Sequence, residues 1–315
     1  MKIVIVTPAP LNTTLGNRIT AARWAGIIGA AGHQVTMANE WRDEECDLLI
    51  ALHARKSHSS VERFHRRLPG RPLIVCLAGT DLYIDLQTSA EARHSVALAT
   101  RLVVLQSRAV DELDVHARNK TSVIYQSAMA PVIKAFPAGN HFQVCVLGHL
   151  REVKDPMRTA LAARSLPASS NIAVIHIGRS IEQEYEQAAK AEQQINPRYQ
   201  WIGEASHERA MQILAGSRLM VLSSLAEGGS NAIAEAVVCG VPVLCSEIPG
   251  NIGMLDAGYP GYFPVNDTGA LARLLLRAET ESDFLFELAG HIKRLQPRFS
   301  PETEAASWHA ILAGY

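Results

Sequence analysis

The sequence predicts an α/β protein of two domains, each built on a parallel β-sheet. Short apolar runs alternate with helix-like segments along the whole chain. The runs are continuous rather than alternating in polarity, which is typical of strands that are covered on both faces. The chain has 315 residues, of which 48% are hydrophobic, and this is enough for two domains with their own cores.

The expected elements follow a β-α-β-α order, which favours parallel sheets with right-handed crossovers. In the first half the expected strands are KIVIV, CDLLIAL, PLIVCLAG, RLVVLQS and TSVIYQS. In the second half they are FQVCVLG, IAVIHIG, YQWIG, RLMVLSS, VPVLCS and GYFPV. Amphipathic stretches between them, such as ITAARWAGIIGAAG and SIEQEYEQAAKAEQQI, predict helices.

The alternation of strands and helices is interrupted at APVIKAFPAGNH, residues 130–141. This segment contains two prolines, a glycine and an asparagine, which is typical of a linker. We therefore expect an N-terminal Rossmann-like domain at 1–135 and a second one at 141–296. Pro297 and Pro301 set off a last helix, so that 297–315 forms a separate C-terminal segment. Parallel sheets bind ligands outside the carboxyl ends of their strands, and we expect the two sheets to face a common cleft there.

The bulk properties favour small-molecule partners in the cytoplasm. The net charge is −1, which gives no reason to expect nucleic acid or an acidic membrane as partner. The 5 cysteines include no C-x-x-C pair and are expected to be free thiols in a reducing compartment. MKIVIVTPAP is too short for a signal peptide, and no apolar run approaches the roughly 20 residues that span a bilayer. The oligomeric state is not indicated.

The stretch SSLAEGGSNAIAEAVVCGVPVLCSEIPG, residues 223–250, predicts a donor-binding site. A strand ends in two serines, and a glycine pair then permits close backbone approach. A capped helix follows, and its free N–H groups form a site for an anion such as phosphate. Two carboxylates there suit the hydroxyls of a sugar and a ribose. The expected residues are Glu227, Gly228, Gly229, Ser230, Asn231 and Glu235, which together indicate a sugar carried on a nucleoside diphosphate.

The same stretch resembles a known family. Glu227 and Glu235 are separated by seven residues and match the E-x7-E motif of the retaining family-four glycosyltransferases, which have the GT-B fold. VCVLGHLREVKDP resembles the family's strand and loop with Lys154 at the lysine position, and LAGTDLY resembles its HGTD segment with Ala78 at the histidine. The resemblance implies UDP-sugar donors, retention of anomeric configuration, and a C-terminal helix that crosses back to the first domain.

The leaving diphosphate gains negative charge, which cations and N–H groups must stabilise. No D-x-D pair follows a strand, so neither a metal nor another cofactor is expected. Lys154, Arg151 and Glu227 are the expected catalytic residues. The family's phosphate-binding arginine falls at His149, and either His149 or Arg151 is expected to replace it.

Polar loops at the strand ends of the first half predict the acceptor site. TPAPLNTTLGNR leads into a helix, and LHARKSHSS, AGTDLY and YQSA follow later strands. Cations and small hydroxyls dominate these loops, so a small anion fits them better than a lipid or a bulky sugar. The expected acceptor-binding residues are Asn12, Thr14, Asn17, Arg18, Lys56, Thr80 and Gln126, and His53 is a weaker candidate.

TPAP, LHARKS, LAGTDLY and LGHLR…KDP are most similar to the selenosugar synthases of selenoneine biosynthesis within that family. This resemblance implies transfer of a sugar from a donor of the UDP-GlcNAc or UDP-glucose type to selenophosphate, with formation of a C–Se bond. Two alternatives stay open. One is a family-four transferase with a conventional hydroxyl acceptor, and the other is a nucleotide-sugar-binding protein without catalysis.

Overall fold

The computed structural model describes residues 1–10, 16–131 and 141–315. The chain forms two compact units, of which the first contains residues 1–126 and 301–315 and the second contains residues 127–300. Each unit has one six-stranded sheet in which every pair of neighbours is parallel. The linker predicted at 130–141 lies mostly outside the described residues.

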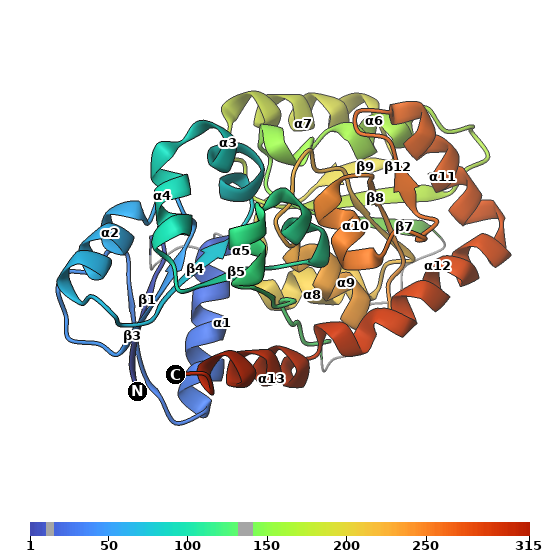
Figure 1. The fold of residues 1–315 in the computed structure, drawn as a ribbon. Coiled ribbons are helices and arrows are strands. Elements are labelled where there is room, and N and C mark those ends of the chain that lie inside the picture. The colour runs from blue at the N-terminus through green and yellow to red at the C-terminus, as the bar shows by residue number, and fades with distance from the viewer. Residues whose placement is uncertain (11–15, 132–140) are drawn as a thin grey trace. The chain divides into compact units, whose positions relative to one another are not determined.

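The first unit contains strands β1 to β6 and most of the helices of the N-terminal half (Figure 1). Its strands are β1 Lys2–Val6, β2 Gln34–Ala38, β3 Leu48–Leu52, β4 Leu73–Leu77, β5 Arg101–Val104 and β6 Thr121–Val123. Its helices are α1 Gly16–Ala30, α2 His58–Arg67, α3 Leu86–Thr88, α4 Ala90–Leu98, α5 Val115–Asn119 and α13 Pro301–Leu312. The strand order is β2-β1-β3-β4-β5-β6, so the order reverses between β1 and β3.

The second unit has the strand order β12-β11-β10-β7-β8-β9, which reverses between β7 and β10. Its strands are β7 Phe142–Leu147, β8 Ile172–Ile177, β9 Tyr199–Trp201, β10 Leu219–Leu222, β11 Val243–Ser246 and β12 Tyr262–Phe263. Its helices are α6 Arg158–Arg164, α7 Gln183–Ile195, α8 His207–Ala215, α9 Asn231–Val238, α10 Pro249–Leu255, α11 Thr268–Thr280 and α12 Ser282–Leu295. This is the Rossmann order, and ligands of such sheets bind where the order reverses.

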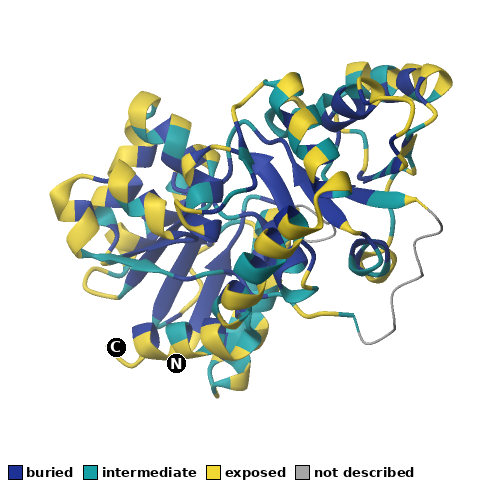
Figure 2. Cartoon of the chain, turned by 90° about the vertical axis from the view of Figure 1, so that its right-hand side faces the viewer, coloured by how far each residue is buried: buried dark blue, intermediate teal, exposed yellow. Residues whose placement is uncertain are grey.

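The continuous apolar runs form strands because packed side chains cover both faces of each sheet. Ile3, Ile5 and Ile50 pack on one face with α1 and α13, whereas Val4 and Leu49 pack on the other face with α2, α4 and α5. Figure 2 shows most of the strand residues as buried. Each strand predicted from the sequence is present.

The edge strand β2 was not predicted. None of its residues is fully buried, and QVTMA lacks the continuous apolar run of the inner strands. It pairs only with β1.

The C-terminal helix α13 packs against α1 within the first unit (Figure 1). Trp308 is fully buried and meets Trp24 edge to face, with 4.7 Å between ring centroids. The buried carboxylate of Glu304 accepts a hydrogen bond from Trp24 Nε1 at 2.8 Å and pairs with Arg23 Nε at 2.9 Å. A buried carboxylate requires such partners, so these contacts specify where the helix crosses back.

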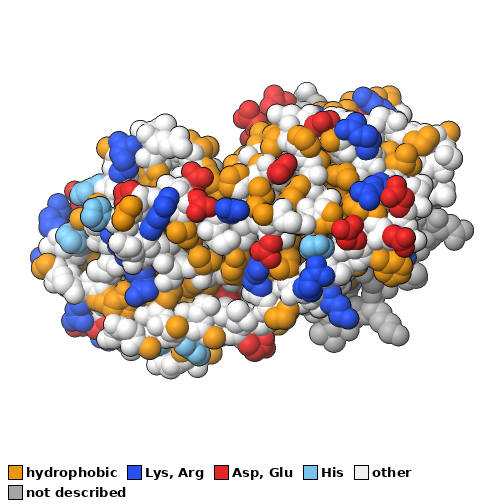
Figure 3. Space-filling view, turned by 45° about the vertical axis from the view of Figure 1, so that its right-hand side comes forward, with side chains coloured by type: hydrophobic (Ala, Val, Ile, Leu, Met, Phe, Trp, Pro, Cys, Tyr) orange, Lys and Arg blue, Asp and Glu red, His pale blue; other side chains and the backbone are white. Residues whose placement is uncertain are grey.

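No helix in the described part of the chain is long and apolar enough to cross a membrane. On the face seen in Figure 3, Lys and Arg side chains are interspersed with Asp and Glu, in keeping with the net charge of −1.

Candidate functional site

A small pocket lies at the point where the strand order of the second unit reverses. It is lined by the ends of β7 and β10, including Gly148 and Ser223, together with Lys154, Pro156 and the buried His176. Neighbouring strand ends at such a reversal leave room for a ligand between the loops that follow them. The sequence predicted function at these two strand ends, and the structure places the loop with Lys154 beside them.

Lys154 and Glu227 form an ion pair in this region. The ammonium group of Lys154 donates to Glu227 Oε1, and the Ser224 hydroxyl donates to the same oxygen at 2.6 Å. The side chains are 19% and 9% exposed, respectively. The contact with Glu227 therefore orients the ammonium group of Lys154 at the rim of the pocket.

The loop that carries Lys154 is attached to the end of β10. Ser223 Oγ donates to the carbonyl of Asp155 at 2.9 Å, and the backbone N–H of Leu225 donates to the carbonyl of Val153 at 2.9 Å. A Cβ at Gly250 would collide with the carbonyl of Glu227, so glycine is required there for the start of α10 to approach. The ion pair therefore sits on backbone fixed from two sides.

The predicted helix cap is present at the start of α9. Ser230 is the N-cap, and its hydroxyl accepts from the backbone N–H of Ile233 at 3.4 Å. Gly228 and Gly229 precede it, and Asn231 is the first residue of the helix. The first N–H groups of α9 thus follow the glycine pair, an arrangement that suits an anion site at a helix N-terminus.

Glu235 lies one turn into α9, with a side chain that is 19% exposed. Its Oε1 is 3.7 Å from Nδ1 of His207 at the start of α8. Burial raises the pKa of the Cys239 thiol to about 12, and the nearby charge of Glu235 adds to this effect. Glu227 and Glu235 consequently differ: the former is paired with a lysine, and the latter lies beside an exposed histidine.

His149 lies within a group of cations at the ends of β7 and β8. Its Nδ1 accepts a hydrogen bond from the backbone N–H of Arg179 at 3.1 Å. Burial lowers the pKa of His149, and the charges of Arg179, Arg151 and Lys154 lower it further, against an opposing effect of Glu204. The ring is therefore neutral near pH 7 and carries its proton on Nε2, where it can donate to an anion.

Arg179 was not predicted from the sequence. It follows β8, where Gly178 lets the chain pass the carbonyl of Gly148 so closely that any Cβ would collide. The motif IHIGRS, a strand followed by glycine and arginine, was a usable signal, because β8 ends beside β7.

The predicted acceptor residues of the first unit fall into three groups. Asn12 and Thr14 lie outside the described residues. Asn17 and Arg18 are in the first turn of α1, and Arg18 Nη1 lies 3.8 Å from Met37 Sδ of β2. Gln126 is buried, and its amide oxygen accepts from Thr20 Oγ1 and Arg23 Nη2, each at 2.5 Å. That oxygen is thus engaged in joining the end of β6 to α1.

The third group surrounds His53 at the end of β3. His53 is 3% exposed and has a φ of 73°, a left-handed conformation that costs a non-glycine residue energy. Its Nε2 lies 3.3 Å from Thr80 Oγ1, and its Nδ1 accepts from the backbone N–H of Lys56 at 3.4 Å. Lys56 itself is exposed. Thr80, Lys56 and His53 are therefore brought together.

Two buried carboxylates, Asp81 and Asp85, complete this group. Asp81 accepts backbone N–H bonds from Ala54 at 2.9 Å and Gly79 at 2.8 Å, which tie together the loops after β3 and β4. Asp85 Oδ2 is 3.9 Å from His53 Nε2 and 3.1 Å from Arg55 Nε. Burial lowers the pKa of His53, whereas Asp81 and Asp85 oppose this effect. Strain and buried charge mark His53 as a stronger candidate than the sequence indicated.

Comparison with known proteins agrees with this architecture. A family model described as "Glycosyl transferases group 1" matches residues 133–293. A protein of Xenopus tropicalis named "Glycosyltransferase 1 domain-containing protein 1" is 26% identical over 347 aligned positions, which cover 99% of this chain and 97% of that protein.

Two solved structures are similar over their full extent. Anabaena Alr3699/HepE in complex with UDP-glucose has a TM-score of 0.79 at 17% identity and covers 100% of both chains. Sucrose-phosphate synthase from Thermosynechococcus elongatus has a TM-score of 0.79 at 15% identity, with 99% of this chain and 98% of that chain covered. The two parallel six-stranded sheets are those of the GT-B fold, the architecture predicted from the sequence. With more than half of its length matched by the family model, the chain belongs to the group 1 glycosyl transferases.

Proposed function

We propose that this glycosyltransferase moves a sugar from a UDP-sugar, of the UDP-GlcNAc or UDP-glucose type, to selenophosphate. The observation that carries the donor half of the proposal is the ion pair of Lys154 and Glu227 at the strand reversal of the second unit. The charges of Arg151, Arg179 and Lys154 each lower the pKa of His149, which supports a joint action of these side chains on a diphosphate. Structural neighbours crystallised with UDP and with UDP-glucose add support for this class of donor.

In the proposed reaction the bond between the anomeric carbon and the diphosphate oxygen breaks, and its electron pair leaves with UDP. The selenium of selenophosphate forms the new bond to the same carbon and supplies the electron pair. Lys154, Arg151 and the first N–H groups of α9 stabilise the charge that develops on UDP, so the proposed mechanism needs no metal ion. The family resemblance supports retention of anomeric configuration.

The loops of the first unit support a small anionic acceptor. Lys56 is exposed beside the buried His53 and the exposed Thr80, and Arg18 lies in the first turn of the helix that follows β1. Selenophosphate is already a strong nucleophile and needs little help from a general base. Small substrates, a cytoplasmic location and no cofactor belong to the same proposal, and the free cysteines agree with a reducing compartment.

A hydroxyl acceptor is the second candidate, because one observation favours it. Attack by a hydroxyl group requires a general base. The buried imidazole of His53, whose Nε2 lies 3.9 Å from Asp85 Oδ2, is a side chain of the type that serves as one. A selenium nucleophile attacks without prior loss of a proton to a base, so it has less need of a histidine paired with a carboxylate.

The test is an assay of the purified chain with a panel of nucleotide sugars and, as acceptors, selenophosphate, thiophosphate, phosphate or a set of hydroxyl compounds, in which products are identified by mass. We expect UDP release together with a product in which sugar and selenium are joined. Turnover only with a hydroxyl acceptor would replace selenophosphate by the second candidate. UDP binding without turnover of any acceptor would reduce the protein to a nucleotide-sugar-binding function.

A further inference from the structure

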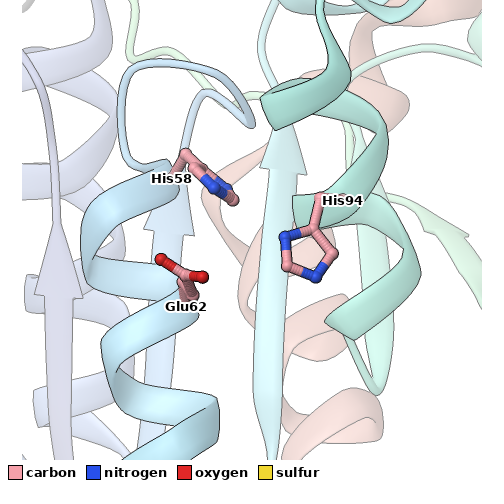
Figure 4. A group of neighbouring side chains, drawn as sticks. All are labelled: His58, Glu62 and His94. Atoms are coloured by element: carbon pink, nitrogen blue, oxygen red, sulfur yellow. The ribbon is translucent and has the colours of Figure 1, made fainter.

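Two helices on one face of the first sheet carry a group of metal-binding side chains outside the site described above. α2 and α4 pack against each other, with Val61 and Phe64 of α2 and Val96 of α4 in one hydrophobic core. His58 and Glu62 are four residues apart on α2 and therefore lie on the same side of that helix. His94 comes from α4, and both imidazole rings turn toward the space between the helices (Figure 4).

The distances suit a single ion. One ligand atom from each of His58, Glu62 and His94 can be chosen so that all three lie within 4.8 Å of one another. Around a tetrahedral zinc ion with bonds of about 2.0–2.1 Å, ligand atoms are about 3.4 Å apart. Each atom must then move by roughly 1 Å, which small side-chain rotations supply because Glu62 and His94 are exposed.

The first ligand is already oriented. His58 Nδ1 lies 2.9 Å from the hydroxyl of Ser95 on α4, so this contact leaves Nε2 for an ion. Metal-binding histidines are regularly fixed in this way through their second nitrogen. The rings of His58 and His94 have centroids 5.3 Å apart at an interplanar angle of 55°, a crossed rather than stacked arrangement.

The chemistry of the group selects the class of ion. Two imidazole nitrogens and one carboxylate suit zinc and related transition metals, whereas magnesium and calcium prefer oxygen ligands only. Within the described ranges, this is the one group of three such side chains that meets the distance condition. Within the described part of the chain, neither the carboxylate of Glu62 nor the imidazole of His94 makes a hydrogen bond or ion pair with another residue.

We propose that His58, Glu62 and His94 bind one zinc ion, which joins α2 to α4 and leaves a fourth position for water. His58 is the first residue of α2 and follows directly on the loop of residues 53–57 that carries Lys56. The ion thus fixes the start of α2 and the C-terminal end of that loop. It is a stabilising ion and takes no part in the transfer reaction.

The test is zinc titration of the full chain, stripped of metal beforehand with a chelator, followed by calorimetry and thermal unfolding. We expect one zinc ion per chain in this site, and at a zinc concentration 100-fold above the dissociation constant a rise of roughly 5–10 °C in the unfolding midpoint. Magnesium should leave the midpoint unchanged. Cobalt in place of zinc should give the visible absorption bands of a four-coordinate ion.

The variants separate this site from other histidines. His94→Ala and Glu62→Gln should each lower zinc affinity at least 10-fold while leaving the midpoint of the metal-free protein unchanged, because both side chains are exposed. His65→Ala removes another exposed histidine of α2 and should bind zinc as the unmodified chain does. Zinc affinity that is the same in His94→Ala and in the unmodified chain would overturn the proposal, as would the absence of any shift with zinc.

Discussion

The two sheets carry opposite arrangements of charge at their carboxyl ends. In the second unit the cations Lys154, Arg151 and Arg179 gather around a neutral histidine, and the buried acid Glu227 is paired with a lysine. In the first unit two acids, Asp81 and Asp85, are buried around His53, whereas Lys56 lies in the exposed part of the loop.

We expect this difference to decide which end holds the diphosphate of the proposed donor. A cation that is oriented before the ligand arrives, as Lys154 is by Glu227, lowers the cost of binding a diphosphate. A strained histidine with buried acids instead positions a group close to the reacting atoms, and strain of this kind is concentrated at functional sites. Four changes test this contrast.

The largest effect is expected from Lys154→Ala. Loss of a preorganised cation should lower kcat by about 10²–10³, and the unpaired Glu227 should also lower the free energy of unfolding. Steady-state kinetics and urea unfolding measure the two effects. Lys190→Ala removes an exposed lysine from an ion pair with Glu186 and serves as the control. Equal losses in both variants would remove Lys154 from the donor site.

The second effect concerns pH and the buried His176 behind the pocket. Its ring contacts the carbonyl of Gly148 and the hydroxyl of Tyr199, both at 3.0 Å, and burial lowers its pKa to about 4. The folded protein keeps the ring neutral, whereas the unfolded chain takes up a proton near pH 6.5. Stability from this group is therefore complete above pH 6.5 and is lost as the pH falls toward 4.

Between pH 7 and pH 5 this loss should be about 2 kcal/mol in the free energy of unfolding. His176→Gln should be less stable at pH 7 and should lose correspondingly less on acidification, as urea unfolding at both pH values will record. A pH dependence identical to that of the unmodified chain would show that His176 is not held neutral by burial.

A smaller effect is expected from Glu235→Ala. Glu235 Oε1 lies 3.7 Å from the exposed His207, and its loss should weaken UDP-sugar binding about 10-fold and lower stability less than the loss of Lys154. Calorimetric titration with UDP and UDP-glucose gives the affinity. Glu208→Ala on the neighbouring helix α8 is the matched control. Unchanged nucleotide affinity would mean that the donor site lies elsewhere.

The smallest effect is expected from Lys56→Ala. An exposed cation contributes modestly, so KM for selenophosphate should rise several-fold, with UDP affinity unchanged. Arg66→Ala, another exposed cation of the first unit, is the control. If Lys56→Ala and Glu235→Ala weakened UDP binding equally, the division of donor and acceptor between the two units would be wrong.

Most of the fold could be predicted because inner strands of a parallel sheet must be apolar throughout. The exception is β2, whose exposed positions break the apolar run. The donor stretch could be predicted as well, because an acid, two glycines and Ser230 follow one another in the chain and the cap is a local interaction.

The cluster around His53 could not be found by the same reasoning, and Arg179 was missed although IHIGRS places it just after a strand and a glycine. Arg179 reaches His149 only because β7 and β8 are neighbours in the sheet. His53 lies far from Asp81 and Asp85 in the sequence, and neither its φ of 73° nor the burial of these three side chains has a signature in residue order.

The sequence by itself determined the two parallel sheets, the capped helix α9 and the glycine-rich turn before it, since these depend on periodicity and on contacts between near neighbours in the chain. Only the tertiary structure decided which charges became partners: Lys154 with Glu227, Glu304 with Trp24 and Arg23, and His58 beside His94. The physical reason is that charge and hydrogen-bond interactions act over a few ångströms in space. Residues tens to hundreds of positions apart reach that range only after the strands have paired and the helices have packed.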